Sequence, residues 1–331
     1  MHLFRAITVA LVLTLSTALT VAGTEVKAGE APRTVVTIKP IHALVAGVMA
    51  GVGEPVLLVS GGASPHMHAM KPSNARALAT ADLVIWVGPE MESFFIKPAQ
   101  SIPASVTLLT LIDSASLNRL KVRRSGAWDH HADENDHNHA KHANENDNNH
   151  AKFARPPGAD EMDAHLWLDP GNGRAIVSLV AETLSHLDPD NGEAYQANAK
   201  RLIAELTNLQ TEITKILEPV RRIPYVVFHD AYQYFEVRFG TNALASISLS
   251  PDRSPSARRL YEIRAKIRQS GAVCVFAEPQ FAPKLVTTAR EGTMAKAGIL
   301  DPLGAEIPTG AGAYAALLRG LAKSLAACLS E

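Results

Sequence analysis

Three histidines far apart in the sequence lie where an α/β protein would place a binding site. His66 lies in the loop after an apolar segment, His165 precedes a long helical stretch, and His229 directly follows the apolar segment Tyr225–Phe228. Asp301 also follows an apolar segment directly. Ligands of open α/β sheets bind beyond the carboxyl ends of the strands. These side chains come from both halves of the chain, so they predict a site between two lobes.

The residue types in this set favour a metal ion. Three neutral imidazoles suit zinc, with copper and nickel as chemical competitors, whereas manganese and magnesium prefer more carboxylate ligands. Asp301, another side chain or a water would fill a fourth position. A single histidine at a strand end is also often a hydrogen-bonded structural residue. His42 and His186, inside or near the end of expected helices, look structural, and His68 could be a ligand, a partner of a ligand or a surface residue.

Both halves of the chain alternate short apolar segments with helical patterns. The strands expected in the first half are Val35–Ile38, Val56–Val59, Leu83–Val87 and Val106–Leu111, and the helices are Ala43–Met49, Asn74–Ala81 and Met91–Lys97. The strands expected in the second half are Tyr225–Phe228, Ala243–Ile247, Val273–Ala277 and Gly298–Leu300, and the helices are Tyr232–Phe239, Ala257–Gln269, Pro283–Ala297 and Tyr314–Ala327. Continuously apolar strands separated by helices indicate parallel sheets covered on both faces.

Two longer helical patterns, Arg174–Leu187 and Gly192–Leu217, lie between the halves, and each is followed by a proline that would end it. The predicted fold class is therefore α/β, with two four-stranded parallel-sheet lobes joined by a long rigid helix and the metal in the cleft between them. We expect a first lobe over residues 29–170, a linking helix over 171–188 and a second lobe over 189–331.

The first 28 residues have the layout of a secretory signal peptide. A short basic start precedes the apolar run Ala6–Ala22, and small residues follow, which places cleavage near residues 22–28. The alternative is a membrane anchor, but the run is shorter than the roughly 20 residues of a spanning helix. We therefore expect an exported protein.

One segment, 129–150, is rich in histidine, acidic residues and asparagine and almost lacks apolar side chains. Such a composition does not bury enough apolar surface to fold, so a loop is expected. It contains six of the thirteen histidines, His130, His131, His137, His139, His142 and His150. This density predicts a secondary, weak metal-binding loop, and a solvated insertion without a role is the alternative.

The remaining composition narrows the class of protein. A formal net charge of −1 gives no basic face for nucleic acid. There are two cysteines, Cys274 and Cys328. In an oxidising compartment a lone pair of cysteines favours a disulfide, and two buried thiols are the alternative.

Several motifs, in order along essentially the whole mature chain, resemble one family. They are Ile38-Lys39-Pro40 with His42, Gly62-Ala63-Ser64-Pro65-His66, Ala81-Asp82-Leu83, Val87-Gly88-Pro89-Glu90-Met91-Glu92, His165-Leu166-Trp167-Leu168-Asp169-Pro170, Phe228-His229-Asp230-Ala231-Tyr232, Phe276-Ala277-Glu278-Pro279-Gln280-Phe281 and Asp301-Pro302-Leu303-Gly304. Together they look like the periplasmic zinc-binding components of ABC importers of the ZnuA type. The combination is specific, although each motif alone is weak.

The resemblance implies a periplasmic protein that binds Zn²⁺ with high affinity and delivers it to an inner-membrane permease with its cytoplasmic ATPase. It implies the ligands His66, His165 and His229, where manganese members typically have a glutamate at the third position. Cys274 and Cys328 match a disulfide of the zinc members, so the resemblance also implies a bond between a strand of the second lobe and the C-terminal helix. We also expect a monomer, and a periplasmic zinc chaperone acting at the histidine-rich loop is a further partner.

The sequence departs from the pattern at Pro65, where some zinc members have a glutamate proposed as a ligand. Asp301 is then the first choice for the fourth ligand, because in related members an aspartate at this strand end completes the site. Water is the second choice and His68 the third.

Two other classes of function stay open at this point. A zinc enzyme would also use three histidines and a water. The sequence contains no His-Glu-x-x-His pattern and no nucleophile elbow, although Glu278 is a candidate base. A periplasmic zinc buffer or a surface adhesin would share the same lobes and cleft.

Overall fold

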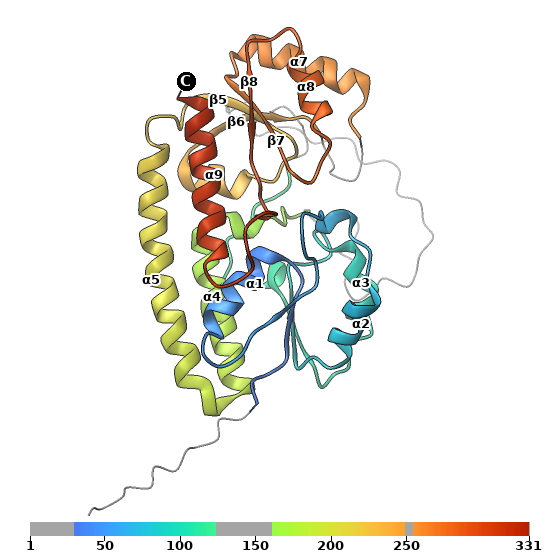
Figure 1. The fold of residues 1–331 in the computed structure, drawn as a ribbon, viewed down its shortest axis with the longest axis vertical. Coiled ribbons are helices and arrows are strands. Elements are labelled where there is room, and N and C mark those ends of the chain that lie inside the picture. The colour runs from blue at the N-terminus through green and yellow to red at the C-terminus, as the bar shows by residue number, and fades with distance from the viewer. Residues whose placement is uncertain (1–29, 124–160, 249–253, 331) are drawn as a thin grey trace, which may run out of the picture.

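The computed structural model describes residues 30–123, 161–248 and 254–330, and it forms two α/β lobes stacked along the long axis (Figure 1). The predicted signal peptide 1–28 and the histidine-rich segment 129–150, with its six histidines, lie outside the described residues. Within the described part of the chain, no helix is both long enough and apolar enough to cross a membrane.

The first lobe contains a four-stranded parallel sheet in the order β2-β1-β3-β4. Its strands are β1 (Thr34–Val36), β2 (Val56–Leu57), β3 (Leu83–Trp86) and β4 (Thr107–Thr110). Its helices are α1 (Lys39–Val48), α2 (Pro72–Ala79) and α3 (Ile96–Gln100). α1 begins four residues before the expected helix, because a proline in its first turn already has the helical φ angle.

The second lobe repeats this topology with the order β6-β5-β7-β8. Its strands are β5 (Pro224–Val227), β6 (Asn242–Ser246), β7 (Cys274–Ala277) and β8 (Lys296–Ile299). Its helices are α6 (Gln233–Phe239), α7 (Ala257–Ser270), α8 (Lys284–Arg290) and α9 (Ala313–Leu329). In both sheets the strand order switches at the first strand of the lobe, which pairs with the second strand on one side and the third on the other. Ligands of open α/β sheets bind at such switch points.

Two expected helices are wrong in extent. In place of Met91–Lys97 the chain forms a 3₁₀ turn (Ser93–Phe95) followed by α3 (Ile96–Gln100). The pattern Pro283–Ala297 predicts a single helix, but α8 ends at Arg290, and β8 already begins at Lys296. Gly292 between them has a φ of 66°, a left-handed conformation that ends the helix. The predicted four strands of each lobe are confirmed.

The chain passes between the lobes through α4 (Pro170–Leu187) and α5 (Gly192–Leu217), which pack against each other. α5 runs along the side of both lobes, and α9 lies beside it (Figure 1). One apolar core joins residues of α1, α4, α5 and α9 with strands of both sheets. Separate clusters cover the other faces, beside α3 in the first lobe and beneath α7 and α8 in the second. The shared core therefore fixes the two sheets against a common layer of helices.

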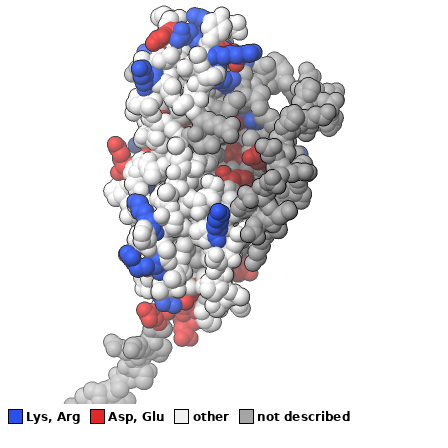
Figure 2. Space-filling view, turned by 90° about the vertical axis from the view of Figure 1, so that its right-hand side faces the viewer, with Lys and Arg blue, Asp and Glu red and all other residues white. Residues whose placement is uncertain are grey.

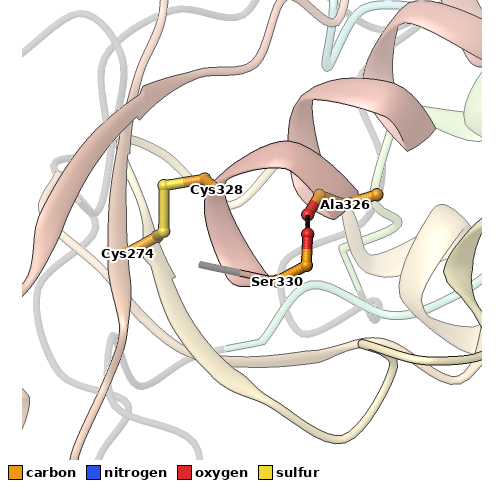
Figure 3. Close-up of a disulfide and its surroundings, with 4 residues drawn as sticks. All are labelled: Cys274, Ala326, Cys328 and Ser330. Atoms are coloured by element: carbon orange, nitrogen blue, oxygen red, sulfur yellow. Dashed lines mark hydrogen bonds between the residues drawn. A yellow bond between two sulfur atoms is a disulfide. The ribbon is translucent and has the colours of Figure 1, made fainter.

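The expected disulfide is confirmed. Cys274 at the start of β7 is bonded to Cys328 near the end of α9 (Figure 3). Both cysteines lie at the end of the second lobe where α9 terminates, so the bond ties the last helix of the chain to the sheet.

Candidate metal centre

The structure brings His66, His165 and His229 together between the lobes. Their ring nitrogens form the one group of potential metal ligands found among the described residues, and all three lie within 4.8 Å of one another. Nε2 of His165 lies 3.4 Å from Nε2 of His66 and 3.3 Å from Nε2 of His229. Residues 163 positions apart thus meet at a single point.

These separations match the geometry of a zinc site. With a Zn–N bond of about 2.0–2.1 Å, two nitrogens of a tetrahedron lie about 3.3–3.4 Å apart. The two Nε2 separations from His165 are 3.4 Å and 3.3 Å. The cluster can therefore accept a tetrahedral ion at His165 with little rearrangement of the side chains.

His165 is positioned by a carboxylate two residues earlier. Asp163 Oδ1 accepts from the backbone N–H of His165 at 2.9 Å and lies 2.8 Å from its Nδ1. Asp163 is itself held in place, because its backbone N–H donates to Leu120 O and its carbonyl accepts from the Tyr234 hydroxyl. An imidazole that donates from Nδ1 presents the lone pair of Nε2, so this contact aims the ligand atom at the cluster.

His229 is positioned by a carboxylate on the neighbouring strand. It follows β5, and Glu278 follows β7, which pairs with β5 in parallel. Glu278 Oε1 lies 2.8 Å from Nδ1 of His229 and accepts from its backbone N–H at 3.3 Å. The switch point of the second sheet therefore holds both the ligand and the group that orients it.

His66 reaches the cluster from the first lobe, in a single 3₁₀ turn (Pro65–Met67) that follows β2. Its ring lies 5.4 Å from the ring of His165 and 6.0 Å from that of His229, measured between centroids. It is half-buried, whereas His165 and His229 are buried. The first lobe thus contributes the most accessible of the three ligands.

The site is buried enough to shift the charges of these groups. Burial lowers the pKa of His165 well below its usual value, and nearby His229 acts in the same direction. Burial also acts to lower the pKa of His229, but the carboxylates of Glu278, Asp230 and Asp163 outweigh it and raise that pKa. Burial raises the pKa of Asp163 to about 7. His165 is therefore neutral, which is the state that a metal ligand requires.

The cavity at the cluster is small and partly open to solvent. It has a volume of about 10 Å³ and is lined by the three histidines together with Trp167, Phe281, Met91 and other residues of both lobes. A volume of this size holds about one water molecule. On the face shown in Figure 2, acidic side chains gather at the level where the lobes meet, which favours the approach of a cation.

The other residues considered for the site are placed elsewhere. Asp301 is not in the histidine cluster; its carboxylate accepts hydrogen bonds from Gln280 Nε2 and from the backbone N–H groups of Leu303, Gly304 and Ala305. The ring of His68 packs edge-on against Phe94, 4.8 Å between centroids. His42 is buried and hydrogen-bonds Pro55 O through Nε2, which is a structural role.

Sequence reasoning missed the orienting roles of Asp163 and Glu278. Asp163 lies two residues before a candidate ligand, and Glu278 directly follows an expected strand next to that of His229. The rule that placed the histidines at strand ends could have found Glu278. It could not have found Asp163, whose contact depends on a local turn.

Comparisons with known proteins agree with this geometry. The family model described as "Zinc-uptake complex component A periplasmic" (ZnuA) matches residues 34–328. The chain is 45% identical over 316 residues to the high-affinity zinc uptake system protein ZnuA of Brucella suis biovar 1 (strain 1330), covering 92% of this chain and 93% of that protein.

Solved structures share the whole fold. A crystal structure of ZnuA matches with a TM-score of 0.70 at 22% identity and covers 90% of this chain and 99% of its own. The laminin-binding protein Lmb of Streptococcus agalactiae, described as bifunctional with adhesin and metal-transporting activity, matches with a TM-score of 0.67. It is 25% identical and covers 89% of this chain and 99% of its own.

Proposed function

Because the chain belongs to the ZnuA family of periplasmic zinc-uptake components, we propose that it captures Zn²⁺ between its lobes and delivers it to a membrane importer. Zinc is the cargo of the protein, held by Nε2 of His66, His165 and His229. The observation that carries this proposal is the pair of Nε2 separations of 3.4 and 3.3 Å, which correspond to the edges of a zinc tetrahedron.

The ligand set favours zinc over harder ions. Among the described residues, the group that could hold a metal contains imidazoles alone. The carboxylates of Asp163 and Glu278 face Nδ1 of two of these imidazoles. Manganese and magnesium prefer oxygen ligands, so a site made of three imidazoles discriminates against them.

Water is the proposed fourth ligand. Gln280 lines the cavity, and its Oε1 is buried and has no hydrogen-bond partner among the described residues. A zinc-bound water is a donor that would satisfy this acceptor.

The protein acts as one part of an uptake complex. The permease in the inner membrane and its cytoplasmic ATPase are the partners to which zinc is delivered. A periplasmic zinc chaperone acting at the histidine-rich segment 129–150, weak zinc binding by that segment and a monomeric state are further parts of the proposal, supported by composition and by the family resemblance.

A transport component of this family is not an enzyme, so the zinc-enzyme alternative is not retained. A zinc buffer or an adhesin would share the same site. Growth of the source bacterium on zinc-chelated medium separates these roles, because only loss of an importer component should abolish growth that added zinc restores.

Calorimetric titration of the metal-free protein with Zn²⁺ and Mn²⁺ tests the proposal. We expect one tight zinc site per chain, much weaker manganese binding, and loss of the tight site in His165→Ala and His229→Ala. Tight zinc binding that survives both substitutions would refute the assignment of the site.

A further inference from the structure

A lysine of the first lobe is bonded to a loop of the second lobe. Nζ of Lys39, in the first turn of α1, donates to the carbonyl oxygens of Gly304, Ala305 and Ile307 at 2.7, 2.9 and 3.0 Å. An ammonium has three donors, and all three are used here. Lys39 is 7% exposed, which is unusual for a lysine and requires such compensation.

The same loop encloses the carboxylate of Asp301. Oδ1 of Asp301 accepts from the backbone N–H groups of Leu303 and Gly304 at 3.1 and 3.0 Å, and Oδ2 accepts from that of Ala305. Gly304 has a φ of 67°, a left-handed conformation that favours glycine at this turn. The N–H groups of the loop thus point at Asp301 while its carbonyl groups point at Lys39.

This loop borders the metal cavity. Pro302 and Leu303 line the cavity, and Nε1 of Trp167 in the first lobe donates to Pro302 O at 2.8 Å. Gln280, which also lines the cavity, donates to Asp301 Oδ1 at 2.9 Å. Asp301 is therefore adjacent to the site through its neighbours, yet its own carboxylate is outside the histidine cluster.

We propose that Lys39 is a selectivity-determining residue, because it fixes the loop 301–307 in the conformation that keeps the Asp301 carboxylate away from the metal. The inference rests on the proposed zinc site. With the loop fixed, the ion meets three imidazoles and an open position. With the loop released, Asp301 becomes available as an oxygen ligand, and an oxygen ligand favours Mn²⁺ more than it favours Zn²⁺.

The contacts of Lys39 explain why one side chain would be sufficient to fix the loop. Lys39 bonds three carbonyls within four residues of the loop, so its removal leaves that part of the loop without its bond to the first lobe. The charge of Asp301 also acts on Lys39, since it raises the lysine pKa against the larger lowering caused by burial. Lys39 and Asp301 therefore stabilise the loop from its two sides.

The test compares Zn²⁺ and Mn²⁺ affinities of the full chain and of Lys39→Met, which keeps the length of the side chain without its donors. We expect the ratio of manganese to zinc affinity to rise about 10–100-fold, the range typical for changes around a metal ligand. Adding Asp301→Asn to Lys39→Met should cancel that rise, because the released residue would then lack the carboxylate.

Arg238→Met is the matched control. Arg238 also connects the lobes, through Asp169 at 2.6 and 2.7 Å, but has no bond to the loop 301–307 among the described contacts. We expect its manganese-to-zinc ratio to equal that of the unmodified protein. An equal rise in Arg238→Met would overturn the inference, since general loosening of the lobes would then explain it.

A Lys39→Met variant that binds zinc tightly with an unchanged ratio would also overturn the inference while leaving the proposed function intact. Failure of the proposed function is distinguished by the unmodified protein, which would then lack tight zinc binding. If Lys39→Met does not fold, as judged by thermal unfolding, Lys39→Leu provides the same comparison, because it also removes all three donors.

Discussion

Replacing Glu278 with glutamine removes the charge that orients one of the three ligands. The Glu278 side chain is 1% exposed, and its Oε1 lies 2.8 Å from Nδ1 of His229. Glutamine has nearly the same shape and can still accept from Nδ1, but as a neutral group. The substitution therefore isolates the electrostatic part of the contact from its packing.

The expected loss follows from this change. A hydrogen bond to a charged partner contributes about 1.5–3 kcal/mol, and one between neutral partners about 0.5–1.5 kcal/mol. The difference of roughly 1–1.5 kcal/mol corresponds to about a tenfold weaker zinc affinity. Glu278→Ala leaves Nδ1 of His229 without its acceptor, and the loss should approach about a hundredfold.

Competition against a chelator of known zinc affinity measures these losses. Glu92→Gln is the matched control, because Glu92 is a fully buried glutamate that bonds Thr37, Val87 and Gly88 and does not contact the cluster. Its substitution should alter the free energy of unfolding and leave zinc affinity unchanged. Unchanged affinity in Glu278→Gln, or an equal loss in Glu92→Gln, would refute the orienting role.

Three further predictions concern stability and the histidine-rich segment. Burial raises the pKa of Glu92 to about 7, with the charge of Glu90 adding to the rise, so the folded state keeps a proton that the unfolded state loses. The free energy of unfolding should therefore decrease by on the order of 3 kcal/mol as pH rises from about 4.5 to about 7. Urea titrations at several pH values should show a smaller change for Glu92→Gln than for the unmodified protein. The same dependence on pH in both proteins would contradict this. Replacing Cys274 and Cys328 with serine should lower the free energy of unfolding by about 4 kcal/mol, since the bond closes a loop with a sequence separation of 54. Denaturant titrations measure this loss, and because the bond does not contact the cluster, a parallel loss of zinc affinity would contradict it. Deleting residues 129–150 should remove weak zinc binding in calorimetry and leave one tight site, and loss of the tight site would contradict the assignment to the cleft.

Much of the fold was predictable because its signals are local. Buried parallel strands appear as short apolar runs, and all eight were found to within a few residues. The helix expected over Pro283–Ala297 was wrong because apolar residues of α8 and β8 follow one another closely, and only Gly292 between them marks the break.

The ligands were predictable for a similar reason. His229 lies two residues after the end of β5, and His66 lies in the loop after β2, so the position of the strands in the sequence locates them at one edge of each sheet. His165 lies between an isolated bridge and α4, and its place in the cluster depends on Asp163 and on packing between the lobes. Family resemblance, and not periodicity, identified it.

The conformation of Asp301 could not be predicted from the residues around it in the sequence. Strand-end placement and resemblance both made it the first choice for a fourth ligand, and the residue does follow β8. Whether its carboxylate reaches the metal depends on the N–H groups of its own loop and on Lys39, which lies 265 residues away from Gly304 in the sequence. No pattern within the loop contains that information.

The carboxylates near this site accept hydrogen bonds, and none of them belongs to the histidine cluster. Asp163 and Glu278 accept from imidazoles, which makes those imidazoles better ligands, and Asp301 accepts from backbone amides. A carboxylate therefore lies beside Nδ1 of two of the three rings, while the cluster itself offers only imidazole nitrogens to an ion. The acidic residues that would suit manganese are present in the chain, so the preference for zinc depends on tertiary contacts that decide which atoms those carboxylates face.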